Sequence, residues 1–114
     1  MLDNWCDGWK MAHFPTGWLP TINLIVPGLA FASLYVSDSD LCWMENVISN
    51  PESDDEQRED AILSIANSLA EIARSECGSK WMFGSTHNDK LLEKAKACGF
   101  MVAPKDSRQV VRPL

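Results

Sequence analysis

Few residues in this chain of 114 could carry acid–base or nucleophilic chemistry. Glu45 is the clearest candidate for a general base, because Trp43 and Met44 beside it would raise the pKa of its carboxyl by desolvation. The simpler interpretation is an outward-facing strand glutamate, since charged side chains are rarely buried. His87 and Cys98 cannot form a nucleophilic pair, because the eleven positions between them would span about 16 Å of helix.

The cysteines predict neither a metal site nor disulfides. They are Cys6, Cys42, Cys77 and Cys98, and no two form a C-x-x-C pair. Their spacing and that of His13 match no common zinc template, so we expect no metal. The first residues lack the basic start and apolar segment of a secretory leader, so we expect a cytoplasmic protein with reduced thiols.

Charge and hydrophobicity restrict the classes of partner. The net charge is −6 and 46% of the residues are hydrophobic, which fits one globular domain. Most of the charge lies in an acidic run in which Arg58 is the single base; the acids are Glu52, Asp54, Asp55, Glu56, Glu59 and Asp60. Because nucleic-acid binding needs clustered Lys and Arg, we expect no nucleic-acid partner. No apolar run approaches the roughly 20 residues of a membrane span, so we expect no membrane partner.

The elements that would position these residues begin with an antiparallel meander. Apolar, β-branched runs at residues 21–26, 29–36 and 41–48 are separated by short turn sequences, which predicts three strands. A capping-box pattern from Ser53 to Glu56 then begins a long amphipathic helix. Gly78 is expected to end this helix.

A second unit follows. Residues 80–84 predict a fourth strand, and Thr86 or Asn88 is expected to cap a second helix that ends at Gly99. The inner face of that helix should consist of Leu91, Leu92, Ala95 and Cys98. Residues 100–103 and 109–112 predict a closing pair of strands.

The order of elements predicts an α/β (α+β) fold. An antiparallel meander leads into a βαβ unit, so the sheet should be mixed and twisted, with helices packed on its faces. Residues 21–114 are expected to form a single domain, and residues 1–20 a tryptophan-rich segment packed on that core.

Over residues 21–103 this order resembles the core of the GNAT N-acetyltransferases. Asn88, Gly99 and Phe100 match a spacing common in that family, in which Gly-Phe follows an asparagine by eleven and twelve residues. In the family this unit closes the acyl-CoA cleft. The resemblance therefore implies a GNAT-like fold.

Two positions depart from the family's pattern. Ala95 stands where the family often has the tyrosine taken to protonate the departing CoA thiolate. Matching the long helix to the family signature Q/R-x-x-G-x-G/A aligns Gln57 with its first position, but Asp60 and Ile62 with its glycines. Residues 53–63 contain no glycine, so the chain lacks the loop that lets backbone N–H groups approach the CoA pyrophosphate. We therefore expect no acetyltransferase activity and no bound cofactor.

The expected function is protein binding. Small acetyltransferase-like proteins of tailed bacteriophages are similar in their brevity and tryptophan-rich start, and some are internal virion components. The resemblance implies a virion protein or host factor as partner, and the host cytoplasm or virion as location. The expected contacts are the splayed edge between residues 41–47 and 80–85 and the five tryptophans, Trp5, Trp9, Trp18, Trp43 and Trp81.

Two alternatives stay open. In an active acyltransferase, Glu45 would be the base and Asn88 would position acetyl-CoA. The cofactor would be held by backbone groups of Met44, Asn46 and Ile48 and by Gln57. The other alternative is a homodimeric structural protein.

Overall fold

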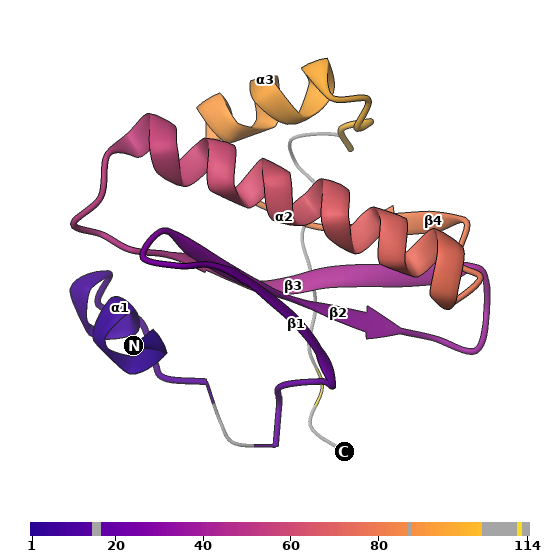
Figure 1. Cartoon of the computed structure of the whole chain (residues 1–114), viewed down its shortest axis with the longest axis horizontal. Coiled ribbons are helices and arrows are strands. Elements are labelled where there is room, and N and C mark those ends of the chain that lie inside the picture. The colour runs from indigo at the N-terminus through magenta and orange to yellow at the C-terminus, as the bar shows by residue number, and fades with distance from the viewer. Residues whose placement is uncertain (15–16, 87, 104–111, 113–114) are drawn as a thin grey trace.

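The computed structural model describes residues 1–14, 17–86, 88–103 and 112, and its helices lie on both faces of one sheet (Figure 1). The elements in chain order are α1 (Leu2–Gly8), β1 (Ile22–Val26), β2 (Ala30–Val36), β3 (Leu41–Ser49), α2 (Asp55–Glu76), β4 (Trp81–Phe83) and α3 (Asp89–Ala97). The predicted α+β class is confirmed, as are the meander and the parallel fourth strand.

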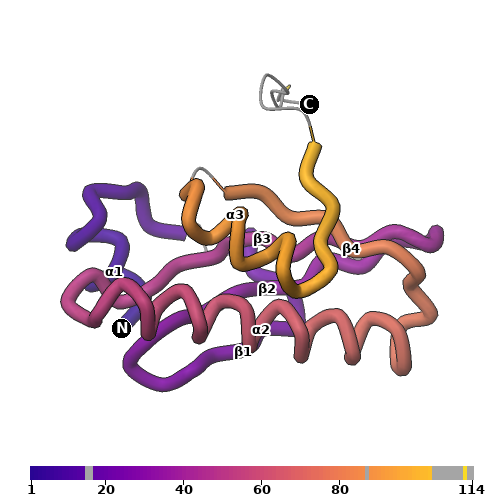
Figure 2. The backbone as a smooth tube through the Cα atoms, turned by 90° about the horizontal axis from the view of Figure 1, so that it is seen from above, coloured from indigo at the N-terminus to yellow at the C-terminus, as the bar shows by residue number. Residues whose placement is uncertain are grey.

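The sheet has the strand order β1-β2-β3-β4. The first three strands pair antiparallel, because three-residue and four-residue turns leave no room for a crossover. β4 pairs parallel with β3, since α2 carries the chain back along the sheet before β4 begins. α3 lies beside α2 on the same side of the sheet (Figure 2).

The main core lies between α2 and the sheet. Leu34 on β2 and Met44 on β3 point toward α2, where Ile65 and Leu69 repeat at helical spacing and meet them. Leu34 and Leu69 are almost completely buried. The apolar stripe predicted from the sequence therefore packs against the sheet.

A smaller core lies on the opposite face, under α1. Trp5 and Cys6 of α1 pack there against Phe31 of β2 and Ile48 of β3. Trp5 is only 6% exposed, which corrects the expectation that it contacts a partner. Its indole fills the space between α1 and the sheet instead.

A β-bulge in β3 allows this strand to serve both cores. The register with β2 shifts between Phe31 and Ser33, and Asn46 adopts a φ of 55° in β3. Side chains of a regular strand alternate, so Met44 and Ile48 would face the same side. The extra residue moves Ile48 to the α1 face, while Met44 faces α2. The Asn46 amide donates hydrogen bonds to Tyr35 and Ser33, which fixes the bulge.

The end of the second unit differs from the prediction. α3 ends at Ala97, and Gly99 turns the chain with a φ of 97°. Phe100 packs back on the main core, whereas residues 101–103 are exposed and form no strand. Cys98 is exposed rather than on the inner face, because it is the C-cap that follows the last helical residue, Ala97. Of the second predicted closing strand, residues 109–111 lie outside the described residues.

The helix starts need one small correction. Asp54, not Ser53, is the N-cap of α2, and its carboxylate accepts hydrogen bonds from the helix's first turn. Asn88 caps α3, as predicted. Among the described residues, no helix combines the length and apolar character needed to cross a membrane.

Candidate functional site

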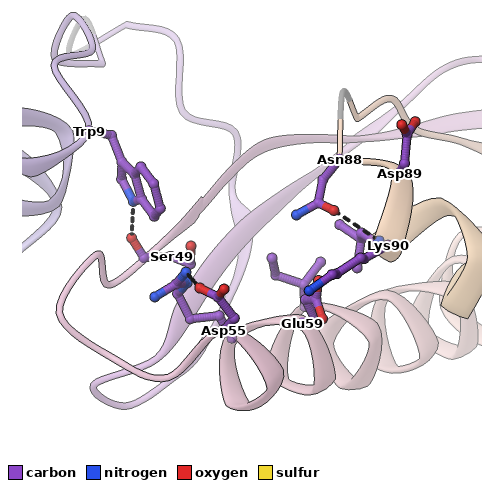
Figure 3. A pocket seen from close by; sticks show the side chains of 10 residues that line it. Trp9, Ser49, Asp55, Glu59, Asn88, Asp89 and Lys90 are labelled. Atoms are coloured by element: carbon purple, nitrogen blue, oxygen red, sulfur yellow. Dashed lines mark hydrogen bonds and ion pairs between the residues drawn. The ribbon is translucent and has the colours of Figure 1, made fainter.

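A cleft opens where β3 and β4 separate. The parallel pairing ends at Trp43 and Phe83, and β3 continues to Ser49 without β4 beside it. A Cβ atom on Gly84 would lie 3.7 Å from the Met44 carbonyl oxygen, so the two chains are still close there. Farther on, Ser49 and Asn88 line a cleft of about 510 Å³ (Figure 3).

The first turn of α2 forms one wall of this cleft and is capped internally. The Asp54 carboxylate accepts hydrogen bonds from the backbone N–H groups of Glu56 (3.1 Å) and Gln57 (3.2 Å). Helix N-termini attract anions because these N–H groups have no partner within the helix. Here two of them already have an anionic partner.

Arg58 is also engaged within the chain. Its guanidinium lies 5.2 Å from the centre of the Trp9 ring and donates to Asp55 and to the Ser53 carbonyl. The Trp9 indole donates to the Ser49 carbonyl oxygen at 2.7 Å. The N-terminal segment thus supplies a wall of the cleft, and the cation nearest the start of α2 is used to hold that wall.

Two carboxylates of α2 are tied to α3. The Lys94 ammonium lies 3.1 Å from Glu59 and 3.3 Å from Asp60. The hydrogen bond to Glu59, more than that to Asp60, raises the pKa of Lys94. The Glu59 side chain is only 9% exposed, so Lys94 compensates a carboxylate that would otherwise be buried unpaired.

The two residues at the expected glycine positions lie differently. Ile62 lines the cleft, as a branched side chain in place of a glycine would. Asp60 does not line it, because it is directed to Lys94. The carboxylates that line the cleft are Asp55 and Glu59 of α2 and Asp89 of α3.

The residues predicted for an active enzyme do not gather in one place. Asn88 lines the cleft, but its Oδ1 accepts from the Leu91 N–H at 3.1 Å as the cap of α3. Glu45 and Gln57 are not part of the lining. Glu45 is half-buried on β3 opposite Ser33 of β2, and Gln57 is exposed on α2.

The side chains of the other proposed cofactor contacts are used in the fold. Met44 is in the main core, and Ile48 is in the smaller core. Asn46 bonds to Tyr35 and Ser33 within the sheet. Sequence reasoning missed Trp9 and Arg58 as cleft residues, because they come from segments far apart in the chain and no local pattern links them.

The environments of the two buried thiols, Cys6 and Cys42, do not favour nucleophilic chemistry. All four cysteines are free. Burial is the main cause that raises the pKa of the Cys6 and Cys42 thiols, which favours their protonated, unreactive form. Within the described ranges, no three His, Cys, Asp or Glu side chains gather as metal ligands would.

A second feature is an apolar surface on the sheet face away from α2. It consists of Trp43 on β3 and Trp81 and Phe83 on β4, hereafter the aromatic surface. Trp43 and Phe83 stack with ring centroids 6.2 Å apart and an interplanar angle of 28°. The three side chains are 37%, 56% and 51% exposed, respectively. Exposed apolar clusters of this kind mark interaction sites more often than isolated exposed residues do.

Three comparisons with known proteins found no relative of this chain. No family model matches the chain, and neither the curated proteins nor the solved structures contain a match.

The Asp54 cap gives a prediction about stability. Asp54→Ala should lower the free energy of unfolding by about 0.5–2 kcal/mol, because two N–H groups at the start of α2 lose their acceptor. Urea denaturation followed by circular dichroism measures this change. Asp54→Asn is the control, since asparagine also caps helices and should retain most of the stability. Equal stability of the alanine variant and the wild type would contradict this role.

His13 gives a prediction about pH. Its Nε2 lies 2.7 Å from Asp7 of α1, and this hydrogen bond is the main cause that raises the pKa of His13. A raised pKa means that protonated His13 stabilises α1 below about pH 6.5, and that this contribution is lost as the pH rises through the higher folded-state value. Hydrogen exchange of α1 amides should therefore speed up, beyond the intrinsic increase, as the pH rises from about 6.5. His13→Gln should remove the excess; an unchanged excess in that variant would rule out His13 as its source.

Proposed function

We propose that this chain is a GNAT-like protein that does not transfer acetyl groups and that acts by binding another protein. The single observation that supports the absence of acetyl transfer is the Asp54 cap. Its carboxylate occupies the N–H groups of Glu56 and Gln57. A diphosphate arriving at the start of α2 would meet a carboxylate at contact distance rather than free donors, and like charges repel there.

Two further features agree with a loss of chemistry. Arg58, the cation nearest this site, is stacked on Trp9 and bonded to Asp55 and Ser53. Ala95 on α3, where the family resemblance implies a tyrosine, has no proton to donate to a thiolate. The cleft keeps Lys90 as a lining cation, but Arg58 is engaged within the chain and Ala95 supplies no acid for a leaving group.

The aromatic surface supports the second half of the proposal. Aromatic residues are enriched in protein interfaces, and Trp43, Trp81 and Phe83 are exposed together on one sheet face. Trp81 and Phe83 are on β4, which has a strand neighbour on one side only among the described residues, and another chain can add a strand at such an edge. A virion component or a host factor of a tailed bacteriophage is the proposed setting, by the resemblance given above.

One observation favours a second candidate, an acetyl-CoA-dependent acyltransferase with an unusual site. The cleft of about 510 Å³ lies within the roughly 300–1,000 Å³ range of ligand pockets, and Asn88 lines it. The two candidates make opposite predictions for cofactor binding.

Isothermal titration with acetyl-CoA separates them. We expect no saturable binding at concentrations up to about 1 mM, because the start of α2 is already capped by Asp54. Free CoA should behave in the same way. A micromolar dissociation constant, together with acetyl transfer to any amine, would establish the enzyme and end the present proposal.

Protein binding is tested by capture of partners on immobilised protein from cells that produce it. Trp81→Lys should abolish capture, because a charge replaces an exposed anchor of the aromatic surface. Trp18→Lys is the matched control: Trp18 is 62% exposed, similar to Trp81, but lies in the N-terminal segment. Equal capture by both variants would exclude the aromatic surface as the binding site.

A further inference from the structure

β4 presents an edge that can pair with a copy of itself. It is the last strand of the sheet, and within the described residues it has a strand neighbour, β3, on one side only. Proteins often protect such edges with charges or proline. From residue 81 to residue 86 this segment contains neither. Its three residues allow few backbone bonds, so side-chain contacts have to supply most of the affinity.

The sequence of this edge is self-complementary. If two β4 strands pair antiparallel about a two-fold axis at Met82, Trp81 of each copy lies opposite Phe83 of the other copy. Since residues 81 and 83 point to one face, both aromatic pairs fall on the face that already carries the Trp43–Phe83 stack. Lys80 comes opposite Gly84, so no like charges meet.

The aromatic surface supplies part of the area that such a contact needs. At their exposed fractions, Trp43, Trp81 and Phe83 present roughly 300 Å² of aromatic surface in each copy. Two copies would bury about half of the roughly 1,200 Å² at which stable interfaces begin. The half-buried Leu41, which pairs with Trp81 on the same face, lies next to this patch and can extend it, and the paired backbones of the two β4 strands add to the contact.

The other edge of the sheet is less suitable. Near the start of β1, the Asn23 side chain donates to the Pro20 carbonyl oxygen at 2.7 Å. The Tyr35 hydroxyl of β2 donates to the Trp18 carbonyl oxygen, so the N-terminal segment already lies over this part of the sheet. Pairing of β1 with β4 would also be head-to-tail and would not close, whereas pairing of β4 with β4 gives a closed dimer.

We propose that the partner of the aromatic surface is a second copy of this chain, bound by antiparallel pairing of β4 with β4 about Met82. This inference rests on the proposed protein-binding function and names its partner. The two four-stranded sheets become one continuous sheet, and the paired aromatic surfaces form the centre of the interface.

Sedimentation of the full chain tests the dimer. The wild type should sediment as a dimer at micromolar concentration, and Trp81→Lys should weaken association at least tenfold with an unchanged circular dichroism spectrum. Trp18→Lys should remain dimeric. A wild-type monomer at about 100 µM, or dissociation by both variants alike, overturns the proposal.

Cross-linking tests the register. In a Cys42→Ala, Cys77→Ser, Cys98→Ser background, which removes the thiol of Cys42 opposite residue 82 on β3, air oxidation of Met82→Cys should give a disulfide-linked dimer, because residues directly opposite in an antiparallel pair have Cα atoms about 4.5–5.5 Å apart. Ser85→Cys is the control, since the two residues 85 would lie about 20 Å apart in this register. Cross-linking at residue 85 but not at residue 82 overturns the register.

Two outcomes identify other occupants. A monomer whose fluorotryptophan NMR signal for Trp81 is shielded from solvent indicates that another segment of the chain covers the aromatic surface, which overturns the inference. A monomer that captures a different protein through Trp81 overturns it as well, but leaves the proposed function intact. Acetyl-CoA binding would end the proposed function without altering the sedimentation result, so the two failures are distinguishable.

Discussion

The packing of α2 across the sheet is the constraint on which the other features depend. A parallel β4 cannot follow β3 through a tight turn, so the chain has to return along the full length of the sheet before β4 begins. The burial of Leu34 and Leu69 fixes α2 in place on β2. The first turn of α2 then forms one wall of the cleft, and the C-terminal end of α2 determines where β4 begins. The cleft and the aromatic surface are thus two results of one crossover.

Much of the fold could be predicted from local patterns. Turn residues separate the three meander strands, and the repeat of Ile65 and Leu69 predicts the buried face of α2. These signals are reliable because burial and turn geometry act on neighbouring residues. Residues 100–103 also have an apolar pattern, but a segment forms a strand only if another strand lies beside it to accept and donate hydrogen bonds. Gly99 and Phe100 direct the chain back to the core instead, which no local pattern predicts.

The candidate site was less accessible to sequence reasoning. Glycine-free residues 53–63 indicated a changed helix start, and Asp54 provides the capping contacts there. The contact of Trp9 with Arg58 and Ser49 joins three distant segments, so only the structure reveals that wall of the cleft. Three of the charged residues that line the cleft are paired: Arg58 with Asp55, and Glu59 with Lys94 of α3. These three charges are compensated within the chain, so the α2 wall of the cleft can persist as a structural feature without binding an ion.

The bulge at Asn46 limits how this sequence can vary over evolutionary time. One additional residue sends Ile48 to one interior and Met44 to the other. Side chains on either half of β3 can be exchanged for others of similar size, but a deletion in the strand would send the apolar residues beyond it to the wrong interior. The fold therefore constrains the residue spacing along β3 more than it constrains the identity of each residue. A search for distant relatives should therefore require an alignment without gaps through β3 rather than a high residue identity.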